Sequence, residues 1–308
     1  MNKAQQKRYQ LLYEQHVNAL KRQGKSKSTI DVYARAVRRV TAFFDRCPDK
    51  LTVDDLKTFF SSLVNTHSWS TVKVDRNGLQ FFYKHVLGKK WVWVDIVKPP
   101  IVKRLPDILT PDEITRLINS TQQARYQTYI LTTYSMGLRL GEALNLKIGD
   151  IDSQPHVMRV HIRNGKGRKD RYVTLPQVTL QALRKYWATH RNPKLIFPAG
   201  KNAAERHQAT AHMDRGGVQK SFKTIVQRCG IHKQVSIHTL RHCYGAHLVE
   251  VGLNQRAIQT EMGHECPKTT ALYTQLTKTT QQNTRGLINR LVERLPLSLT
   301  AEGIEPWN

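Results

Sequence analysis

The spacing of apolar residues over positions 4–88 predicts four consecutive amphipathic helices. Apolar side chains recur there every three or four residues, which is the period of one helix face, and the runs are interrupted at Gly24 and at Pro48. Thr52 with Asp55 three residues later is a capping-box variant that opens a helix. Four short amphipathic helices pack as a compact bundle. Serine caps are expected for the second and fourth helices, at Ser26 or Ser28 and at Ser68 or Ser70.

Residues 89–107 (KKWVWVDIVKPPIVKRLPD) break this helical pattern. Pro99, Pro100 and Pro106 lie there among lysine and arginine residues. Prolines favour extended backbone and interrupt helices, so a stretch of this composition is typical of a linker. We therefore predict that residues 89–107 separate an N-terminal helical domain, residues 1–88, from a second domain.

The second domain begins with a helix-start signal. Thr110-Pro111-Asp112-Glu113 offers an N-cap, a proline at the first helical position and two acids in the first turn. Helical spacing continues over residues 126–134 and is interrupted at Gly137. From Met158 the apolar period changes to two, which predicts a β-hairpin with the turn dipeptide Asn164-Gly165 at its tip.

The predicted fold class is mainly α with a small antiparallel β-sheet. Helices resume near Val178 and over about 218–229, whereas residues 199–216 are interpreted as a mobile basic loop. The predicted domain boundaries are a helical bundle at 1–88, a linker at 89–107, a second domain at 108–290 and a C-terminal tail at 291–308.

The charge of the chain points to a polyanionic partner. Its 49 Lys and Arg residues exceed its 23 Asp and Glu residues, which gives a net charge of +26 and a pI near 10.2. An excess of this size, spread over the whole chain, is typical of nucleic-acid binding. No run approaches the ~18 apolar residues of a membrane-spanning helix, and the first residues lack the apolar core of a signal peptide. We therefore expect a cytoplasmic protein that binds nucleic acid and not membrane.

Basic residues gather on the polar faces of two predicted helices of the bundle. The second helix and the fourth helix each carry three of them, with few acids between. Solvated helix faces usually mix both signs, so these faces favour contacts with a nucleic-acid backbone. The candidate DNA-binding residues are Arg35, Arg38, Arg39, Lys73, Arg76 and Lys84.

The four cysteines are scattered and form no Cys-x-x-Cys pair. Cys243 and Cys266 lie near His242 and His264, which raises the alternative of a zinc site, but neither pair has zinc-ligand spacing. Reduced, partly buried thiols are the favoured interpretation.

The candidate chemistry is concentrated in residues 235–274. His238 and Arg241 are three residues apart, and His264 precedes Tyr273 by nine. A histidine, an arginine or a tyrosine taken alone is usually structural. In this order, however, the four residues offer a phenolic nucleophile, a cation for a phosphate and two proton carriers, which suits attack on a phosphodiester.

Two further candidates precede this stretch. Arg139 follows a glycine break and has Glu142 one helical turn later, close enough to orient it. Lys166 lies between two glycines in the predicted hairpin loop. The plain alternatives are a salt bridge for Arg139 and a solvated turn for Lys166.

Taken together, these motifs resemble the tyrosine recombinase (phage integrase) family over nearly the whole chain. GLRLGEAL resembles the first arginine box, GKGRKDR the hairpin lysine, HTLRH the His-x-x-Arg box, and MGHECPKTTALYT the Gly-His and tyrosine box. GIHKQVSIHTLRH is also similar to the corresponding stretch of integron integrases. Met262 stands where leucine is usual, which is an apolar exchange.

The resemblance implies a fold, a reaction and roles for the residues. It implies a SAM-like core-binding bundle and an α+β catalytic domain that form a C-shaped clamp on double-stranded DNA. Tyr273 would form a 3′-phosphotyrosyl link, while Arg139, Arg241 and His264 would contact the phosphate. Lys166 would protonate the leaving 5′-oxygen and His238 would assist proton transfer. No metal or other cofactor is expected, because fixed cations hold the phosphate and the covalent link conserves its energy.

The family also implies partners and an outcome. Its members work as homotetramers on two DNA sites, through a Holliday junction, and some use accessory DNA-bending or directionality factors. An apolar stripe over residues 287–295 is interpreted as a C-terminal helix that docks on a neighbouring subunit, with packing on its own domain as the alternative. The length and the early start of the bundle favour a Xer-type, integron-type or transposon-borne enzyme, which we expect to be bacterial and nucleoid-associated. Integration, excision, resolution and cassette capture of mobile DNA all remain open.

Two other functions fit parts of the same pattern. A type IB topoisomerase shares the nucleophile and the cations but relaxes supercoils as a monomer. A DNA-binding protein of the same fold would lack catalysis altogether. The C-terminal apolar stripe argues against the first alternative, and the complete set of six site residues argues against the second.

Overall fold

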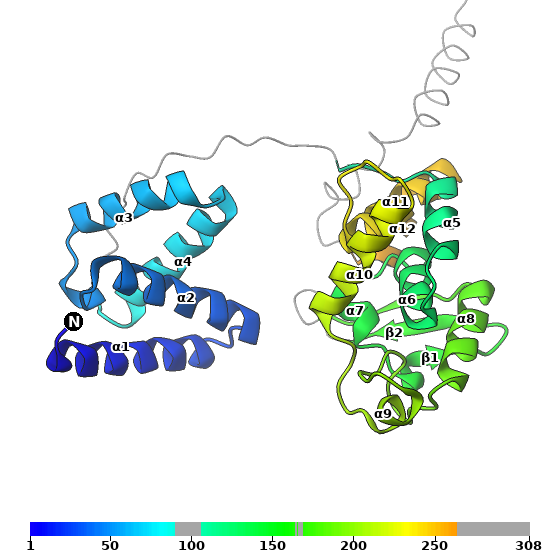
Figure 1. The fold of residues 1–308 in the computed structure, drawn as a ribbon, viewed down its shortest axis with the longest axis horizontal. Coiled ribbons are helices and arrows are strands. Elements are labelled where there is room, and N and C mark those ends of the chain that lie inside the picture. Colours follow the sequence, from blue (N-terminus) through cyan, green and yellow to red (C-terminus); the bar gives the residue numbers. More distant parts are fainter. Residues whose placement is uncertain (90–105, 164, 166–168, 264–308) are drawn as a thin grey trace, which may run out of the picture. The chain divides into compact units, whose positions relative to one another are not determined.

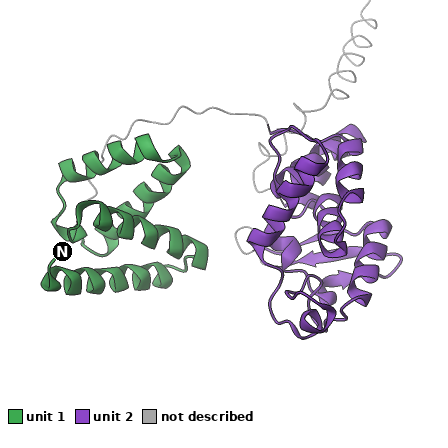
Figure 2. Cartoon of the chain, in the orientation of Figure 1, with its two compact units in different colours: residues 1–103 green, residues 104–308 purple. Residues whose placement is uncertain are grey.

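The chain folds as two compact units, residues 1–103 and residues 104–308 (Figure 2). The computed structural model describes residues 1–89, 106–163, 165 and 169–263. Lys166, His264, Tyr273, most of the predicted linker and the predicted C-terminal helix and tail therefore lie outside the described residues. Each unit is described below by itself.

Unit 1 is a bundle of helices, as predicted (Figure 1). Each helix begins at a polar cap, and Thr52 and Asp55 form a reciprocal capping box. The caps of the second and fourth helices are Ser26 and Ser68. The helices are α1 (Lys3–Arg22), α2 (Lys27–Phe44), α3 (Val53–Thr66) and α4 (Trp69–His85), with a short 3₁₀ turn at Pro48–Lys50.

The core of unit 1 depends on the close packing of α2 against α4. Gly78 of α4 allows this approach, because a Cβ there would lie 2.9 Å from the Cβ of Ala36 and 3.1 Å from the backbone of Tyr33. Buried aromatic rings fill the space between the helices, with Phe59 and Phe60 in edge-to-face contact. The predicted apolar faces of the helices form this core.

In unit 2 the helices α5, α7, α8, α10 and α11 pack on helix α6, and a small sheet lies in the same unit (Figure 1). Helix α6 packs against α8 and α11, and its Tyr129 is fully buried against Phe197. The helices are α5 (Pro111–Asn119), α6 (Ala124–Ser135), α7 (Leu140–Leu144), α8 (Gln177–Ala188), α9 (Ala203–Gln208), α10 (Arg215–Arg228), α11 (Ile237–Glu250) and α12 (Gln255–Met262).

The sheet is antiparallel and has the order β1 (Ile151–Asp152), β2 (Arg159–Ile162), β3 (Arg171–Thr174). The predicted hairpin is β2 and β3, and the two-residue strand β1 was not predicted. The placement of Asn164-Gly165 at the hairpin tip is wrong. The register pairs Ile162 with Arg171, and the Gly165 N–H donates to the Lys169 carbonyl at 3.0 Å, so the two arms of the hairpin still face each other at Gly165. The mainly helical fold with a small antiparallel sheet is confirmed.

The segment 199–216, predicted to be a mobile basic loop, is instead folded around one buried side chain. Its centre is helix α9, which Asn202 caps by accepting from the Glu205 N–H at 2.9 Å. The Asn192 amide, 1% exposed, donates to the carbonyls of Arg206, His207 and Ala209 at 2.8–3.0 Å. The composition of the segment does not reveal these hydrogen bonds, because Asn192 lies outside the segment.

The described residues contain neither a membrane-crossing helix nor a metal-binding cluster. None of their helices is long and apolar enough to cross a membrane. No group of three or more His, Cys, Asp or Glu side chains among them could hold a metal ion. Cys47, Cys229 and Cys243 are buried free thiols, and the Cys243 sulfur accepts from the Leu109 N–H at 3.2 Å.

The Asn192 contacts give a first prediction. Asn192→Ala leaves the three carbonyls and the N–H groups of Lys194 and Leu195 without their partner. Because five part-buried or buried hydrogen bonds are lost together, the free energy of unfolding should fall by about 2–4 kcal/mol. Amide hydrogen exchange should accelerate over residues 203–209. Asn145→Ala, which removes one exposed amide bond to Gly141, is the matched control and should cost less than about 1 kcal/mol. Unchanged protection of 203–209 would contradict this account.

Candidate active site

The candidate site begins at the turn between α6 and α7. Gly137 adopts a left-handed conformation with φ of 57°, and a Cβ there would collide with the ring of Tyr244. This turn delivers Arg139 as the N-cap residue of α7. The Glu142 carboxylate accepts the Arg139 backbone N–H at 2.9 Å, so one acidic side chain fixes both the helix start and the arginine.

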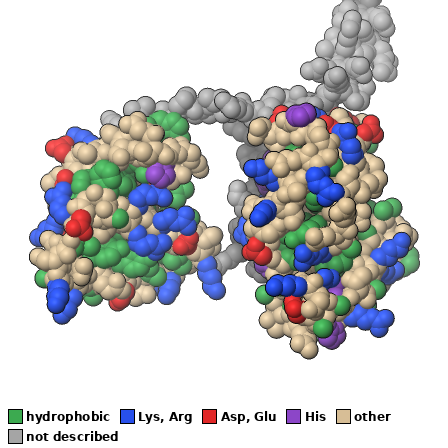
Figure 3. Space-filling model, viewed as in Figure 1, with side chains coloured by type: hydrophobic (Ala, Val, Ile, Leu, Met, Phe, Trp, Pro, Cys, Tyr) green, Lys and Arg blue, Asp and Glu red, His purple; other side chains and the backbone are tan. Residues whose placement is uncertain are grey.

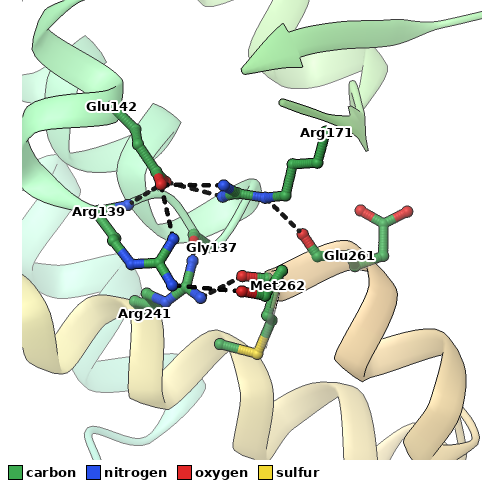
Figure 4. A network of polar contacts seen from close by, with 8 residues as sticks. Gly137, Arg139, Glu142, Arg171, Arg241, Glu261 and Met262 are labelled. Carbon is green, nitrogen blue, oxygen red and sulfur yellow. Dashed lines mark hydrogen bonds and ion pairs between the residues drawn. The ribbon is translucent and has the colours of Figure 1, made fainter. Parts of the chain in front are cut away.

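The Glu142 carboxylate receives four hydrogen bonds from two arginines (Figure 4). Arg139 adds its Nη1 at 2.7 Å, and Arg171 on β3 donates through Nη1 and Nη2 at 2.9 and 2.8 Å. Burial by itself raises the pKa of Glu142, but the donors of Arg171 and then those of Arg139 outweigh it and lower this pKa to about 2. The carboxylate is therefore ionised at neutral pH, and its acceptor sites are filled.

Three consecutive backbone carbonyls at the C-terminal end of α12 each accept from a different arginine (Figure 4). Arg171 Nε bonds to Glu261 at 3.3 Å, Arg241 Nη2 to Met262, and Arg139 Nη2 to Gly263 at 3.4 Å. The last carbonyls of a helix lack partners within the helix and carry partial negative charge. The end of α12 thus gathers three guanidinium groups that come from three separate elements.

Arg241 is almost completely buried, with 2% of its surface exposed. It lies on α11, and its Nη1 donates to the carbonyl of Gly137, two residues before Arg139. Its two named partners therefore belong to the α6–α7 turn and to the end of α12. This holds the guanidinium next to the Arg139 segment.

Two histidines on α11 lie beside these cations. The rings of His238 and His242 are 5.1 Å apart and nearly perpendicular. Burial, followed by the charges of Arg241 and Arg139, lowers the pKa of His238. Burial, with His238 and Arg241 next to it, lowers the pKa of His242 to about 4. His242 is therefore neutral at pH 7, and the lowered pKa of His238 also favours its neutral form.

A second contact fastens α12 to the sheet. The Glu261 carboxylate accepts the Thr174 backbone N–H at 3.1 Å and the Thr174 hydroxyl at 2.6 Å. Gly263 then ends α12 with φ of 58°, and a Cβ there would lie 2.7 Å from the Arg171 Cδ. The chain therefore leaves α12 in direct contact with the side chain of Arg171.

The structure brings together four of the predicted site residues: Arg139, Glu142, His238 and Arg241. The orientation of Arg139 by Glu142, expected from their spacing, is observed. Gly263 is the residue before His264, so the described cluster ends where that predicted residue begins. Lys166, His264 and Tyr273 lie outside the described residues.

The sequence did not single out Arg171, Glu261 or Thr174. A signal for Arg171 was present, because it shares an inward strand face with the buried Val173 two residues later. An arginine at such a position needs an acidic partner. No comparable pattern marks Glu261, which lies on the last turn of α12, far along the chain from its partner Thr174.

The basic face of unit 1 is partly balanced by acids. Arg35 pairs with Asp31 at 2.7 Å, Arg38 lies 3.8 Å from the same carboxylate, and Arg39 pairs with the buried Asp75. Asp31 is the one acid of α2 and lies against Arg35 and Arg38, whereas Asp75, the partner of Arg39, belongs to α4. Figure 3 nevertheless shows many basic side chains and few acidic ones on the visible face of each unit. The DNA-binding residues stay a prediction.

Comparisons with known proteins define the class of this molecule. The model of the phage integrase family matches residues 107–280, and the model of the phage integrase N-terminal SAM-like domain matches residues 12–93. The chain belongs to the phage integrase family. The resemblance inferred from the arginine, lysine, histidine and tyrosine motifs is thereby confirmed.

Individual relatives show which kind of protein within this family the chain resembles. A tyrosine recombinase of Thermosipho africanus is 31% identical over 262 residues, which are 80% of this chain and 88% of that protein. The tyrosine recombinase XerD of Halalkalibacterium halodurans is 32% identical over 206 residues, 65% of this chain and 67% of that one. The structure of the XerH site-specific recombinase in a post-cleavage complex with its difH substrate has a TM-score of 0.66 and 20% identity. It covers 88% of this chain and 83% of XerH. The protein is thus a tyrosine recombinase, an enzyme of DNA recombination.

The depressed pKa of Glu142 gives a prediction with a definite sign. Its pKa falls from an ordinary 4.5 to about 2 on folding, so its ionised form stabilises the protein above pH 4.5. This stabilisation is lost as the pH falls from 4.5 towards 2. Glu142→Gln should lower the free energy of unfolding by about 3 kcal/mol at pH 7, because it leaves two part-buried guanidinium groups without their counter-charge. The difference from the wild type should shrink below pH 4.5.

Urea unfolding of both proteins from pH 7 to pH 3 measures this difference. Glu250→Gln removes an exposed carboxylate and is the matched control, with no expected effect at either pH. A Glu142→Gln deficit that is the same at pH 3 as at pH 7 would contradict the assignment.

Proposed function

We propose that this protein is a site-specific recombinase that cleaves and rejoins double-stranded DNA through a 3′-phosphotyrosine at Tyr273 and a Holliday junction. The observation that carries the proposal is the anchoring of Arg139 and Arg241 on the carbonyls of Gly263 and Met262, directly before His264. Two guanidinium groups fixed at one point suit the two non-bridging oxygens of a phosphodiester. We infer that His264 adds a further donor to the same phosphate.

In the proposed reaction the phenolic oxygen of Tyr273 bonds to phosphorus, and the bond from phosphorus to the 5′-oxygen breaks. The phenolic proton passes to His238, whose neutral form can accept it because burial and the nearby arginines lower its pKa. Lys166 gives a proton to the departing 5′-oxygen. Arg139 and Arg241 hold the charge that develops on the phosphoryl oxygens, a contribution typically worth ~10²–10³ in rate for each donor.

The reverse of this step joins the DNA to a different 5′-hydroxyl. Because the phosphotyrosyl link conserves the energy of the broken bond, strand exchange needs no ATP, and we propose no metal or other cofactor. Two exchanges of this kind, on two DNA sites held by a homotetramer, produce and then resolve a Holliday junction. The proposed outcome is integration, excision or resolution of mobile DNA.

The proposed partner is double-stranded DNA. The net charge of +26 supports it, as does the DNA complex of XerH, whose fold this chain shares. We propose that residues 1–88 and 108–290 form the two sides of a clamp around the duplex, joined by the linker 89–107. Arg35, Arg38, Lys73, Arg76 and Lys84 are proposed to contact phosphates. Arg39, whose partner is the buried Asp75, is proposed to take part through its remaining donors.

The assignment of the nucleophile predicts a covalent product. A nicked duplex made from the sequences that flank this gene should trap the wild-type protein in a covalent DNA complex, seen as a shifted band on a denaturing gel. Tyr273→Phe should abolish the band without changing DNA affinity by more than about twofold, because only the nucleophilic oxygen is removed. A band of equal strength with the variant would show that another residue is the nucleophile.

The role of Lys166 predicts a chemical rescue. Lys166→Ala should slow covalent complex formation by about 10²–10⁴-fold, the usual size of a lost general acid. A substrate with sulfur in place of the bridging 5′-oxygen should restore the rate, because a thiolate leaves without being protonated. If the sulfur substrate leaves the variant as slow as before, Lys166 does not act as the acid.

A further inference from the structure

We infer that Arg171 is a positioning residue for the reaction, which keeps the charge of Arg139 available to the scissile phosphate and fixes the backbone that leads into His264. The inference rests on the proposed function, because it concerns the same site. It assigns a role to an arginine outside the six predicted site residues and Glu142.

The first step is the direction in which Arg171 faces. Only 12% of its side chain is exposed, and its guanidinium is turned towards Glu142 and the end of α12 (Figure 4). Its Nη1 and Nη2 form a two-pronged contact with Glu142, and its Nε donates to the Glu261 carbonyl. Arg171 therefore orients other residues of the site and is largely shielded from solvent.

The second step is the charge of the trio formed by Arg139, Glu142 and Arg171. Two guanidinium groups share one carboxylate, so the trio carries a net charge of +1. Without Arg171, Glu142 would neutralise Arg139 and the net charge would be zero. An ion pair of that kind would compete with a phosphate for the same donors, since it lies in a part-buried environment where Coulomb interactions are strong. Because of Arg171, the positive charge of Arg139 is not cancelled by Glu142 and can act on the phosphate.

The third step is the contact between Arg171 and Gly263. The side chain lies so close to Gly263 that a Cβ there would be 2.7 Å from the Arg171 Cδ. The Nε bond to Glu261 holds the same turn two residues earlier. Arg171 is also the first residue of β3, five residues after Lys166. One side chain thus joins the Arg139 helix, the strand that follows Lys166 and the turn that precedes His264.

The structure also indicates that Arg171 can be replaced without detaching α12. Glu261 and Thr174 hold α12 on β3 through two hydrogen bonds that do not involve Arg171. Arg241 separately holds the Met262 carbonyl. A variant at position 171 should therefore keep its fold while losing the alignment and the charge balance of Arg139.

The test compares Arg171→Ala, Arg171→Lys and the double variant Arg171→Ala/Glu142→Gln. Each is assayed in the full chain for the single-turnover rate of covalent complex formation on the nicked duplex of gene-flanking sequence. DNA affinity and thermal unfolding are measured in parallel. Arg171→Ala should be about 10²-fold slower than wild type, with affinity within about twofold.

Charge balance makes two distinguishing predictions. Arg171→Lys should be at least about tenfold faster than Arg171→Ala, because an ammonium group still neutralises Glu142. The double variant should also be about tenfold faster than Arg171→Ala, because a neutral amide no longer draws Arg139 away from the phosphate. A residue that only supported the fold would give no such rescue on removal of a second contact. Arg184→Ala, which loses one exposed bond to Ser153, is the matched control and should react at the wild-type rate.

Each other result overturns the inference. A wild-type rate for Arg171→Ala would exclude any role. A double variant no faster than Arg171→Ala would exclude charge balance, as would an equally slow Arg171→Lys. A loss of affinity that matches the loss of rate would make Arg171 a DNA contact. If Arg171→Ala unfolds, Arg171→Lys decides the question against the wild type: it should react within about tenfold of the wild-type rate, and a folded lysine variant that is about 10²-fold slower would exclude charge balance. Failure of the wild type to form the covalent complex, with binding intact, would overturn the proposed function itself.

Discussion

The arrangement of the candidate site depends on one buried carboxylate, that of Glu142. A buried acid is tolerated only when charge and hydrogen bonds compensate it, and here Arg139 and Arg171 fill its acceptor sites with four donors. Each arginine is in turn held at its other side by a carbonyl of α12. The relative positions of α7, β3 and α12 are therefore set by ionic hydrogen bonds rather than by apolar packing alone.

The C-terminal end of α12 reduces the mutual repulsion of the arginines at this site. Three guanidinium groups gathered in one place repel one another in the absence of DNA. The C-terminal carbonyls of a helix carry the negative end of its dipole, roughly half an elementary charge, and together with Glu142 they offset part of this repulsion. Because the same carbonyls also orient the arginines, the cations are already in place for the proposed phosphate. Preorganisation of this kind is what makes electrostatic catalysis effective.

Local signals were sufficient to predict most of the helices, though not α9, and part of the site. Capping residues such as Thr52 and Thr110 bond to groups within four residues, so they can be recognised in the sequence. The pairing of Arg139 with Glu142 is equally local, because it spans one helical turn. Arg171 and Glu261 were not predicted as site residues because their partners are 29 and 87 residues away. These contacts form only when the chain folds, so the spacing of residues in the sequence does not reveal them.

The segment 199–216 is a second case in which a contact formed on folding could not be predicted from the sequence. Its composition is that of a loop, but the amide of Asn192 makes five hydrogen bonds, three of them to carbonyls of this segment. A single buried polar side chain has no periodicity, so hydrophobic patterns do not reveal it. The hairpin tip was misplaced for a related reason. Asn-Gly favours a tight turn locally, but the strand register, fixed by the pairing of Ile162 with Arg171, is decided by burial.

The packing of Tyr244 against Gly137 also bears on which phenol can react. Burial, with Glu261 and Tyr134 nearby, raises the pKa of Tyr244 to about 12, so its hydroxyl is protonated at neutral pH. A protonated, enclosed phenol is a poor nucleophile. In the proposed reaction this second phenol therefore does not compete with Tyr273 for the phosphate.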